Sequence, residues 1–553
     1  MSRFTPLRAC RRISPAAMVA GSAIAALALV SCASSGGSGS TAAPTEWELT
    51  TETPAPSGDI DTVTWASYSE PYSLDYAYAF DYADNQVLAN VCESLLRLNP
   101  DFTLSPGLAE SFENPTPTTW VYQIRQGVTF HDGSPMTAAD VVASMSRHID
   151  PVIGSSWFSV YQNVETIEQT GEHEVTVTTR IPDSQFNLGM GGSAGVVESA
   201  ATLAEAGAEY GNSTTGVNCT GPFAFDSWQS GESITLTRYD DYWNDELRAK
   251  SAEFEFVFMG DATARVNALK SGEVDGSWMI PMDAVPQLRE AGSGDVLFGL
   301  NTSVLDLVVS DLDGPLGQVR GRQAPRTAPD REGILQAGSG GIGAVTDVHT
   351  TESVWGEASD AARERAFGDA EAYPFDVEAA KNLVEEAGAT GEEITMVTAP
   401  LGQDFAVISQ ATAAAAKSIG LEVTIETVTP SAYTALFSDP SAREGVDLFY
   451  TNWYLSSPDP LEMYAVLRTD EFSNYGNWSN EEFDRIVSEA VETEDPEARS
   501  ELTADAQLIA NAELPWLPIG EVPTSVFMGD RVTGLTPSVA YLYYPWAATL
   551  GAR

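Results

Sequence analysis

The residues of this chain best suited to chemistry are aromatic and amide side chains that could hold a small molecule. Trp278 follows a short segment with a strand pattern, and Asn452-Trp453 follows another. Tyr68 and Tyr72 follow the first predicted strand. An aromatic ring can stack on a sugar face or an apolar side chain, and an amide both donates and accepts hydrogen bonds. These positions therefore indicate a binding site for a small solute.

Motifs for catalysis are missing from the same sequence. We find no Ser nucleophile elbow between a strand and a helix, no HExxH motif and no phosphate loop of the GxxxxGK type. Carboxylates are so frequent, 79 Asp and Glu against 28 Lys and Arg, that closeness in sequence identifies no catalytic pair. Only four His occur, without a His/Cys cluster, so neither a metal site nor a cofactor is expected. The sequence favours a binding protein, with a secreted hydrolase as the alternative class.

The four cysteines have different expected fates. Cys10 lies in a predicted export signal that is removed, and Cys32 ends the sequence LVSC (29–32), which resembles a bacterial lipobox. In a lipobox the peptidase cuts before a Cys whose sulfur already carries lipid. Cys92 and Cys219 remain as an even pair in an oxidising compartment, which predicts a disulfide between them. Two buried free thiols are the alternative.

The amino end has the three-part plan of a secretory signal peptide, predicted over 1–31. An apolar run over 16–30 follows four basic residues, Arg3, Arg8, Arg11 and Arg12. At about 15 residues, this run is shorter than the roughly 20 that a membrane-spanning helix needs. The twin arginine leaves both the Sec and the twin-arginine export routes open.

The segment 32–58 is rich in Ser, Gly, Thr and Pro and has no apolar periodicity. That composition predicts a flexible tether between the lipidated Cys32 and a soluble body. The expected location is the cell surface, with the protein anchored by lipid to the outer face of the cytoplasmic membrane.

The charge balance is strongly acidic, with a formal net charge of −51 at pH 7. Acidic residues are spread along the chain, so they indicate a solvated surface and do not identify a ligand. Such a surface repels nucleic acid and anionic lipid and favours solubility. No nucleic-acid partner is therefore expected, and the protein is expected to be a monomer.

Helix and strand signals alternate through the body, which predicts α/β lobes. Asp261 begins a predicted helix that Gly272 ends, and Asp376 begins another that Gly388 ends. A third helix is predicted over about 407–419.

Four strands are predicted from short apolar or alternating runs, at 61–67, 273–275, 421–425 and 446–450. In open α/β sheets the ligand crevice lies at the carboxyl ends of the strands. That rule selects Trp278 and the Asn452-Trp453 corner as ligand contacts. The alternative is that one or both of these Trp side chains belong to the hydrophobic core.

In its order of motifs the chain resembles a known family, the family 5 extracellular solute-binding proteins of ABC importers, which includes oligopeptide-, dipeptide- and nickel-binding proteins. The strongest match is WVYQIRQGVTFHDGSPMTAADVVASMSR (120–147), in which Thr137 and Asp140 could form a capping box. Other matching segments follow in family order: 91–96, 108–111, 220–223, 238–243, 271–275, 300–301, 330–331, 376–388 and 453–460.

The resemblance implies an α/β fold, a two-lobed clamp like the type II periplasmic binding proteins, with an extra subdomain in the first lobe. The expected divisions are lobe one over 59–300 with the subdomain at about 97–205, lobe two over 301–514, and a return to lobe one over 515–553. It also implies that solute is sealed between the lobes and that the partner is the permease of an ABC importer.

One position departs from the family pattern. Peptide-binding members read Trp-x-x-Asp-x-x-Asp-Pro at the strand end in lobe two, and the first Asp pairs with the peptide ammonium. Here the segment is WYLSSPDP (453–460), which places Ser456 at the amine-pairing position and Tyr454 beside Trp453. A hydroxyl cannot replace a charge-assisted bond of about 1.5–3 kcal/mol. Either the solute lacks a free amine or the amine is bound elsewhere.

A second departure lies at 323–330, where Pro325 and Pro329 should break the helix that the family has there. The expected function is capture of a small solute for import. An oligopeptide is the first candidate, because peptides are the largest substrate class of the family. An oligosaccharide or another amine-free solute is the alternative.

Overall fold

Two β-sheets organise the chain in the computed structural model, which describes residues 46–553. The predicted signal peptide and Cys32 lie outside the described residues. Within 46–553, none of the helices combines the length and the apolar character needed to cross a bilayer.

The first sheet has seven strands in the order β12-β19-β11-β1-β10-β9-β8. Its first strand, β1 (Ile60–Ser67), pairs in parallel with β10 (Ser251–Phe258). The other strands are β8 (Phe223–Gln229), β9 (Ser233–Arg238), β11 (Gly276–Trp278), β12 (Gly294–Gly299) and β19 (Thr524–Gly529). We call the body built on this sheet lobe one.

The helices of lobe one begin and end where local sequence dictates. The carboxylate of Asp261 accepts a hydrogen bond from Ala264 N at 2.7 Å, and Gly272 ends α6 (Ala262–Ser271) at φ 71°, so the predicted helix is confirmed. The other helical segments are α1 (Tyr82–Leu88), α7 (Val285–Ala291), α17 (Trp546–Thr549) and the 3₁₀ turns η4 (Met282–Ala284) and η7 (Val539–Leu542).

A separate four-stranded antiparallel sheet, β4-β5-β7-β6, is inserted between β1 and β8 along the chain. Its strands are β4 (Ala109–Thr116), β5 (Thr119–Ile124), β6 (Val164–Gly171) and β7 (Glu174–Thr179). With it come a hairpin and four helices: β2 (Leu96–Leu98), β3 (Leu104–Pro106), α2 (Ala138–Arg147), α3 (Phe158–Tyr161), α4 (Ser184–Gly189) and α5 (Ala200–Ala206). The Thr137/Asp140 capping box at the start of α2 is present.

The second sheet has six strands in the order β14-β18-β13-β17-β15-β16 and forms the body that we call lobe two. Its strands are β13 (Val304–Val309), β14 (Ala344–Val345), β15 (Glu393–Thr398), β16 (Glu422–Thr427), β17 (Leu448–Trp453) and β18 (Trp516–Glu521). Its longer helices are α8 (Val319–Thr327), α9 (Arg331–Ser339), α10 (Asp360–Gly368), α11 (Val377–Ala387), α12 (Gln403–Ser418), α13 (Pro430–Ser438), α15 (Glu481–Val491) and α16 (Pro496–Glu513).

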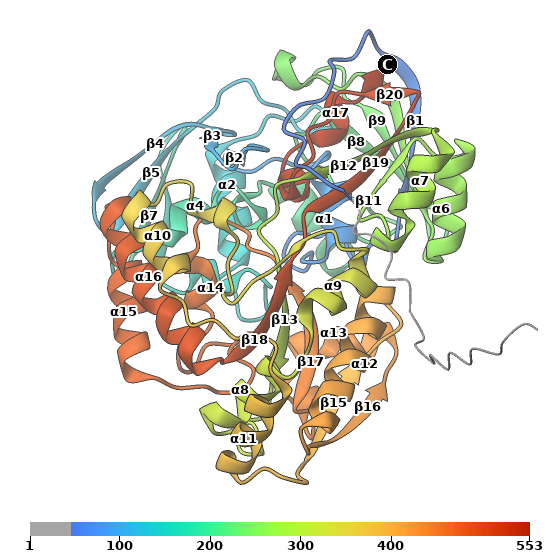
Figure 1. Ribbon diagram of the computed structural model, residues 1–553. Coiled ribbons are helices and arrows are strands. Elements are labelled where there is room, and N and C mark those ends of the chain that lie inside the picture. The colour runs from blue at the N-terminus through green and yellow to red at the C-terminus, as the bar shows by residue number, and fades with distance from the viewer. Residues whose placement is uncertain (1–45) are drawn as a thin grey trace, which may run out of the picture. The chain divides into compact units, whose positions relative to one another are not determined.

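The chain passes between the two sheets at two crossovers. The first follows β12 and ends where β13 begins at Val304. The second lies between β18 and β19, which appear in Figure 1 as successive red strands. The expected return near Pro515 therefore comes after Glu521, because β18 pairs with β13 over its length and belongs to lobe two.

Three sequence expectations were wrong in detail. Residues 273–275 precede the strand, which is β11, because the three residues Gly276–Trp278 pair with β19. The strand expected over 446–450 is β17, which runs on through Trp453. Pro325 lies inside α8, whose Arg322 side chain donates to the carbonyls of Leu316, Gly317 and Glu513. Pro325 lies in the last turn of α8, which ends at Thr327, two residues before Pro329.

Candidate functional site

The two lobes meet through two tyrosine side chains. Tyr82 is the first residue of α1, and Tyr454 follows β17 in lobe two. The Tyr454 hydroxyl donates to the Phe80 carbonyl at 2.6 Å, which joins the end of β17 to the loop before α1. The Tyr82 hydroxyl lies 3.2 Å from Ser303 Oγ in the first crossover. The Tyr82 and Tyr454 rings themselves meet edge to face at 5.0 Å. The crevice between the lobes is therefore closed at this point by aromatic contacts.

The corner after β17 is held by one carboxylate. Glu462 accepts four hydrogen bonds of 2.6–2.9 Å, from the backbone N–H and the hydroxyl of both Ser456 and Ser457. Burial raises the pKa of this carboxyl, and these hydrogen bonds act against the rise. The Ser456 hydroxyl is thus turned toward Glu462, and Asp459 forms a buried ion pair with Arg499 at 2.9 Å. Asp459 is a structural residue of the turn.

The predicted contacts in lobe one differ in exposure. The Tyr68 hydroxyl donates to Asp81 Oδ1 at 2.6 Å, one turn before Asp84 on α1. Trp278 is 2 % exposed and stacks on Tyr541 of η7, with ring centroids 4.2 Å apart and 7° between the planes. The Tyr72 side chain is 85 % exposed, and its backbone N–H donates to Asp84 Oδ1 on α1 at 2.6 Å.

In lobe two, the predicted contacts lie at the end of β17. Trp453 is half-buried and its ring packs edge to face on Trp516 at 5.2 Å. Asn452 is half-buried, and its Oδ1 has no hydrogen-bond partner. Of the seven side chains, Tyr68 and Tyr454 lie nearest to α1 through the contacts above, and the roles of all seven in binding stay predictions.

Sequence reasoning missed the residues that α1 and η7 bring to the crevice. Gln86 Nε2 donates to Ser67 Oγ at the end of β1, and Ser193 Oγ lies 3.3 Å from Asn85 Oδ1. Tyr541 and Tyr543 come from the last part of the chain. No local signal marks these residues, because they are polar positions of a short helix and a turn far apart in sequence.

Six of the buried polar atoms without a partner belong to these elements and to the predicted contacts. They are Asp84 Oδ2, Asn85 Nδ2, Gln86 Oε1, Trp278 Nε1, Asn452 Oδ1 and Tyr543 Oη. A buried polar group that lacks a hydrogen bond costs about 1–3 kcal/mol, so each such group calls for an explanation. The set contains donors and acceptors, which is the combination that a polar solute with its own amide or hydroxyl groups would satisfy.

The side chains around α1 and η7 are poorly solvated and lie near the carboxylates of Asp81 and Asp84. Burial is the main cause that raises the pKa values of Tyr68, Tyr82, Tyr541 and Tyr543, and Asp81 raises the first three further. Burial also raises the pKa of the Asp84 carboxyl, with Asp81 as the second cause. The tyrosines therefore stay neutral and act as hydrogen-bonding groups.

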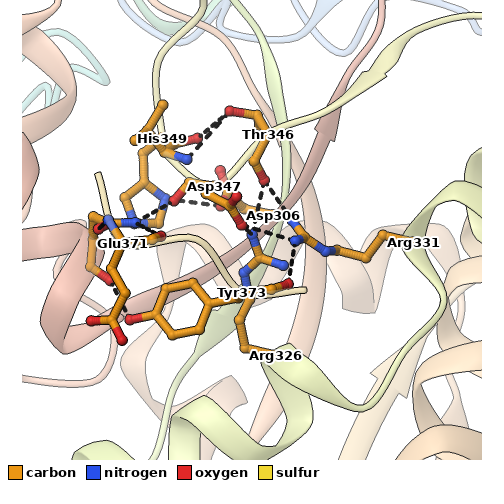
Figure 2. A network of polar contacts seen from close by, with 10 residues as sticks. Asp306, Arg326, Arg331, Thr346, Asp347, His349, Glu371 and Tyr373 are labelled. Atoms are coloured by element: carbon orange, nitrogen blue, oxygen red, sulfur yellow. Dashed lines mark hydrogen bonds and ion pairs between the residues drawn. The ribbon is translucent and has the colours of Figure 1, made fainter. Parts of the chain in front are cut away.

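A buried polar network in lobe two fixes the segment that supports the first crossover (Figure 2). Arg326 and Arg331 both donate to Asp347 Oδ1, at 2.6 and 2.8 Å, and both donate to the Thr346 carbonyl. His349 Nδ1 lies 2.9 Å from Asp306 Oδ1 on β13. Two residues beyond His349, Thr351 Oγ1 donates to the Asn301 carbonyl at 3.0 Å. The network thus ties the crossover to the core of lobe two.

Two small cavities lie in lobe two, with volumes of about 10 and 20 Å³. The first is lined by Arg326, Arg331 and apolar residues, and the second lies behind the turn at Asp459. The smaller cavity has room for about one water molecule. Within residues 46–553, no group of three or more His, Cys, Asp and Glu residues could hold a metal ion.

Comparison with known proteins relates this geometry to a protein family. The profile of the bacterial extracellular solute-binding proteins, family 5 (middle region), matches residues 103–475. The glutathione-binding protein GsiB of Escherichia coli (strain K12) is 23% identical over 455 residues, which cover 81% of this chain and 86% of GsiB.

Solved structures of the same architecture include the periplasmic binding protein DppA of Helicobacter pylori in complex with the peptide STSA. DppA matches with a TM-score of 0.79 and 19% identity over 90% of this chain and 98% of its own. The oligopeptide-binding protein AppA of Bacillus subtilis, in complex with a nonapeptide, matches with a TM-score of 0.76 and 20% identity, over 90% of this chain and 100% of its own. The fold is therefore that of the two-lobed periplasmic binding proteins.

Proposed function

We propose that this chain, which belongs to the bacterial extracellular solute-binding proteins of family 5, captures an oligopeptide between its lobes and delivers it to the permease of an ABC importer. The observation that carries the choice of solute is the set of unpartnered donors and acceptors on α1, Trp278, Asn452 and Tyr543. A peptide backbone offers amide donors and carbonyl acceptors that would satisfy both kinds. The same choice is supported by GsiB, which is named a glutathione-binding protein, and by DppA and AppA, whose structures contain bound peptides.

The proposed mechanism is closure around the solute. A solute that contacts both lobes stabilises the closed form relative to the open form, because only contacts that differ between the two forms shift their equilibrium. Tyr454 and Tyr82 close the crevice, and Asn452 and Trp453 lie on the lobe-two side. We assign five residues as contacts with the solute: Tyr68, Trp278, Tyr454, Asn452 and Trp453. We assign Tyr72 and Ser456 to the rim of the binding crevice.

An amine-free solute such as an oligosaccharide is the second candidate. The observation in its favour is Ser456, whose hydroxyl is bound to Glu462 where peptide-binding relatives are expected to offer a free carboxylate. Aromatic rings of the crevice would then stack on sugar faces.

Thermal unfolding with defined mixtures separates the two candidates. The protein is heated alone, with a mixture of tri- to pentapeptides, and with a mixture of di- to tetrasaccharides. A bound solute raises stability by RT ln(1 + [L]/Kd), so the peptide mixture is expected to raise the melting temperature. A rise with sugars alone would select the second candidate. Recovery of hydrolysed solute would contradict a binding protein and favour the hydrolase.

We also propose that the mature protein begins at a lipidated Cys32 and is a monomer held at the outer face of the cytoplasmic membrane by that lipid. The support is the LVSC sequence after the predicted signal peptide over 1–31. Cys32→Ala should release the protein from the membrane fraction. An unmodified amino-terminal Cys32 in the mass spectrum of the wild-type protein would contradict the proposal.

A further inference from the structure

We infer that the solute carries an ammonium group and that Asp84 of α1 receives it. This inference rests on the proposed function and names the charged group that the binding crevice selects. It assigns the amine to lobe one, in place of the corner in lobe two where this chain has Ser456.

Asp84 differs from the other buried carboxylates. Asp84 is 1 % exposed; its Oδ1 accepts a hydrogen bond from Tyr72 N at 2.6 Å, and its Oδ2 has no partner. The other fully buried carboxylates among residues 46–553 are Asp75, Asp183, Glu198, Asp275, Asp306 and Asp459.

Asp75 and Glu198 form ion pairs with Arg147, at 2.6 and 2.7 Å, and Asp275 and Asp459 form ion pairs of 2.9 Å with Arg531 and Arg499. Asp306 Oδ1 lies 2.9 Å from His349 Nδ1. Glu198 Oε1 and Asp306 Oδ2 have no partner, but each of these carboxylates has a basic side chain beside it. Asp183 has no such pair, but both of its oxygens accept hydrogen bonds, from two backbone N–H groups and Asn163 Nδ2. Asp84 lacks both a cation and a partner for one oxygen. A buried carboxylate in this condition is costly, and the cost is removed when a cation binds beside it.

The surroundings of Asp84 favour a cation from outside the protein. The charged neighbour that acts on Asp84 is Asp81, a like charge three residues earlier on the same side of α1. The guanidinium of Arg265 donates from Nη1 to the Met259 carbonyl at 2.6 Å and forms no ion pair with Asp84. The unpartnered Asn85 Nδ2 and Gln86 Oε1 follow directly on the helix. An ammonium group would supply both the hydrogen bond that Asp84 Oδ2 lacks and a positive charge beside this carboxylate.

The alternative reading is that Asp84 serves only the backbone of the loop before α1, through its bond to Tyr72 N. Asp84→Asn separates the two roles, because an asparagine oxygen can still accept from Tyr72 N while the negative charge is lost. Asp275→Asn is the matched control, since Asp275 is also buried in lobe one but is neutralised by Arg531.

The probes are a lysine-free mixture of tri- to pentapeptides with free α-amino groups and the same mixture after N-acetylation. Retention of each by the full mature protein is measured by native mass spectrometry and by the shift in melting temperature. The wild-type protein should prefer the free-amine mixture by about 10- to 100-fold, the range of a charge-assisted bond. Asp84→Asn should abolish that preference, and Asp275→Asn should keep it at a lower melting temperature.

Three results would overturn the inference. Equal retention of the two mixtures by the wild-type protein would show that the protein does not recognise an ammonium group, and it would leave the proposed function intact. A preference that survives Asp84→Asn would place the ammonium at another residue. Retention of neither mixture would overturn the proposed peptide function itself, and the inference with it. The wild-type comparison needs no variant, so it stands even if Asp84→Asn folds poorly.

Discussion

At the scale of single residues, Trp278 and Trp453 follow the same sequence rule but end in different surroundings. Each is the last residue of a strand, Trp278 of β11 and Trp453 of β17. Trp278 is 2 % exposed, because Tyr541 covers one of its faces, and its ring lies 6.2 Å from Trp65 and 5.4 Å from Trp546. Trp453 stays half-buried. The tertiary surroundings therefore give Trp278 a larger share in stability than Trp453.

Truncation of each Trp should reveal this difference. Trp278→Ala is expected to lower the free energy of unfolding by about 3–5 kcal/mol, the cost of emptying a buried aromatic site. Trp453→Ala should cost less stability and weaken solute binding by about 1–3 kcal/mol. Chemical denaturation and titration with the retained solute measure the two effects, and Phe472→Ala, at a side chain 60 % exposed, is the control. Equal losses of stability in both variants would contradict this prediction.

A second prediction at the residue scale concerns the effect of His148 on the pH dependence of stability. The residue is 4 % exposed, its Nδ1 lies 2.7 Å from Ser155 Oγ, and its ring stacks on Tyr161. Burial, and then the neighbouring charge of Arg147, lower the pKa of His148 to about 3. In the unfolded chain the imidazole titrates near its ordinary value, so the unfolded state binds the extra proton first as pH falls, and folding is destabilised.

Stability should therefore fall below about pH 6.5 and go on falling toward pH 3. His148→Gln removes this contribution. Between pH 6.5 and 4.5, the wild-type protein should lose roughly 2–3 kcal/mol relative to the variant. The measurement is urea denaturation of both proteins across this pH range. Parallel curves for the two proteins would show that His148 is not the group responsible.

At the scale of elements, a disulfide joins the segment after α1 to the segment just before β8, where the chain returns to lobe one from the subdomain. Cys92 and Cys219 are bonded in the structure and lie 127 residues apart in sequence. Both are almost fully buried, at 2 % and 0 % exposed. The bond closes a long loop that contains the whole inserted four-stranded sheet. Its main effect should be on the unfolded chain.

Removal of both sulfurs tests this. Cys92→Ala with Cys219→Ala should lower the free energy of unfolding by roughly 3–5 kcal/mol in the loop-entropy model. Reduction of the wild-type protein should give a loss of similar size, which serves as the control for the changed side-chain volumes. Two thiols titrated in the unfolded, non-reduced wild-type protein would show that the bond is absent.

At the scale of the whole described body, a small set of hydrogen bonds joins the lobes, and one of them runs from Ser184 Oγ of α4 to the Ala490 carbonyl of α15 at 3.5 Å. Tyr454 and Tyr82 each contribute one hydrogen bond across the crevice or to the crossover. Thr302 also binds Leu455 through its hydroxyl and holds the β17 corner to the first crossover. With so few bonds, a solute that bridges the lobes can decide between the open and closed forms.

Loss of one of these hydroxyls should open the solute-free protein. Tyr454→Phe removes a bond worth about 1 kcal/mol net, which shifts the open–closed balance by roughly five-fold. The radius of gyration from small-angle X-ray scattering should increase without solute and return to the wild-type value with saturating solute. Tyr433→Phe is the matched control, because that hydroxyl donates to Tyr450 within lobe two. An unchanged radius for Tyr454→Phe would contradict its part in closure.

The sequence by itself was sufficient to predict where helices begin and end, because those positions are set by local interactions. Asp261 and Gly272 bound α6, Asp376 and Gly388 bound α11, and Thr137 with Asp140 begins α2, because capping needs only atoms a few residues apart. The order of family motifs was also enough to identify the two-lobed clamp. Strand ends were less certain, since β11 and β17 each extend as far as their neighbours offer hydrogen bonds.

The tertiary structure alone decided the character of the site. Trp278 is buried by Tyr541 from the far end of the chain, Ser456 is bound by Glu462, and Asp84 is buried without a cation. Each outcome depends on which distant groups share a small volume from which water is excluded. Burial and charge pairing arise from that arrangement, so a residue's type and spacing cannot reveal them.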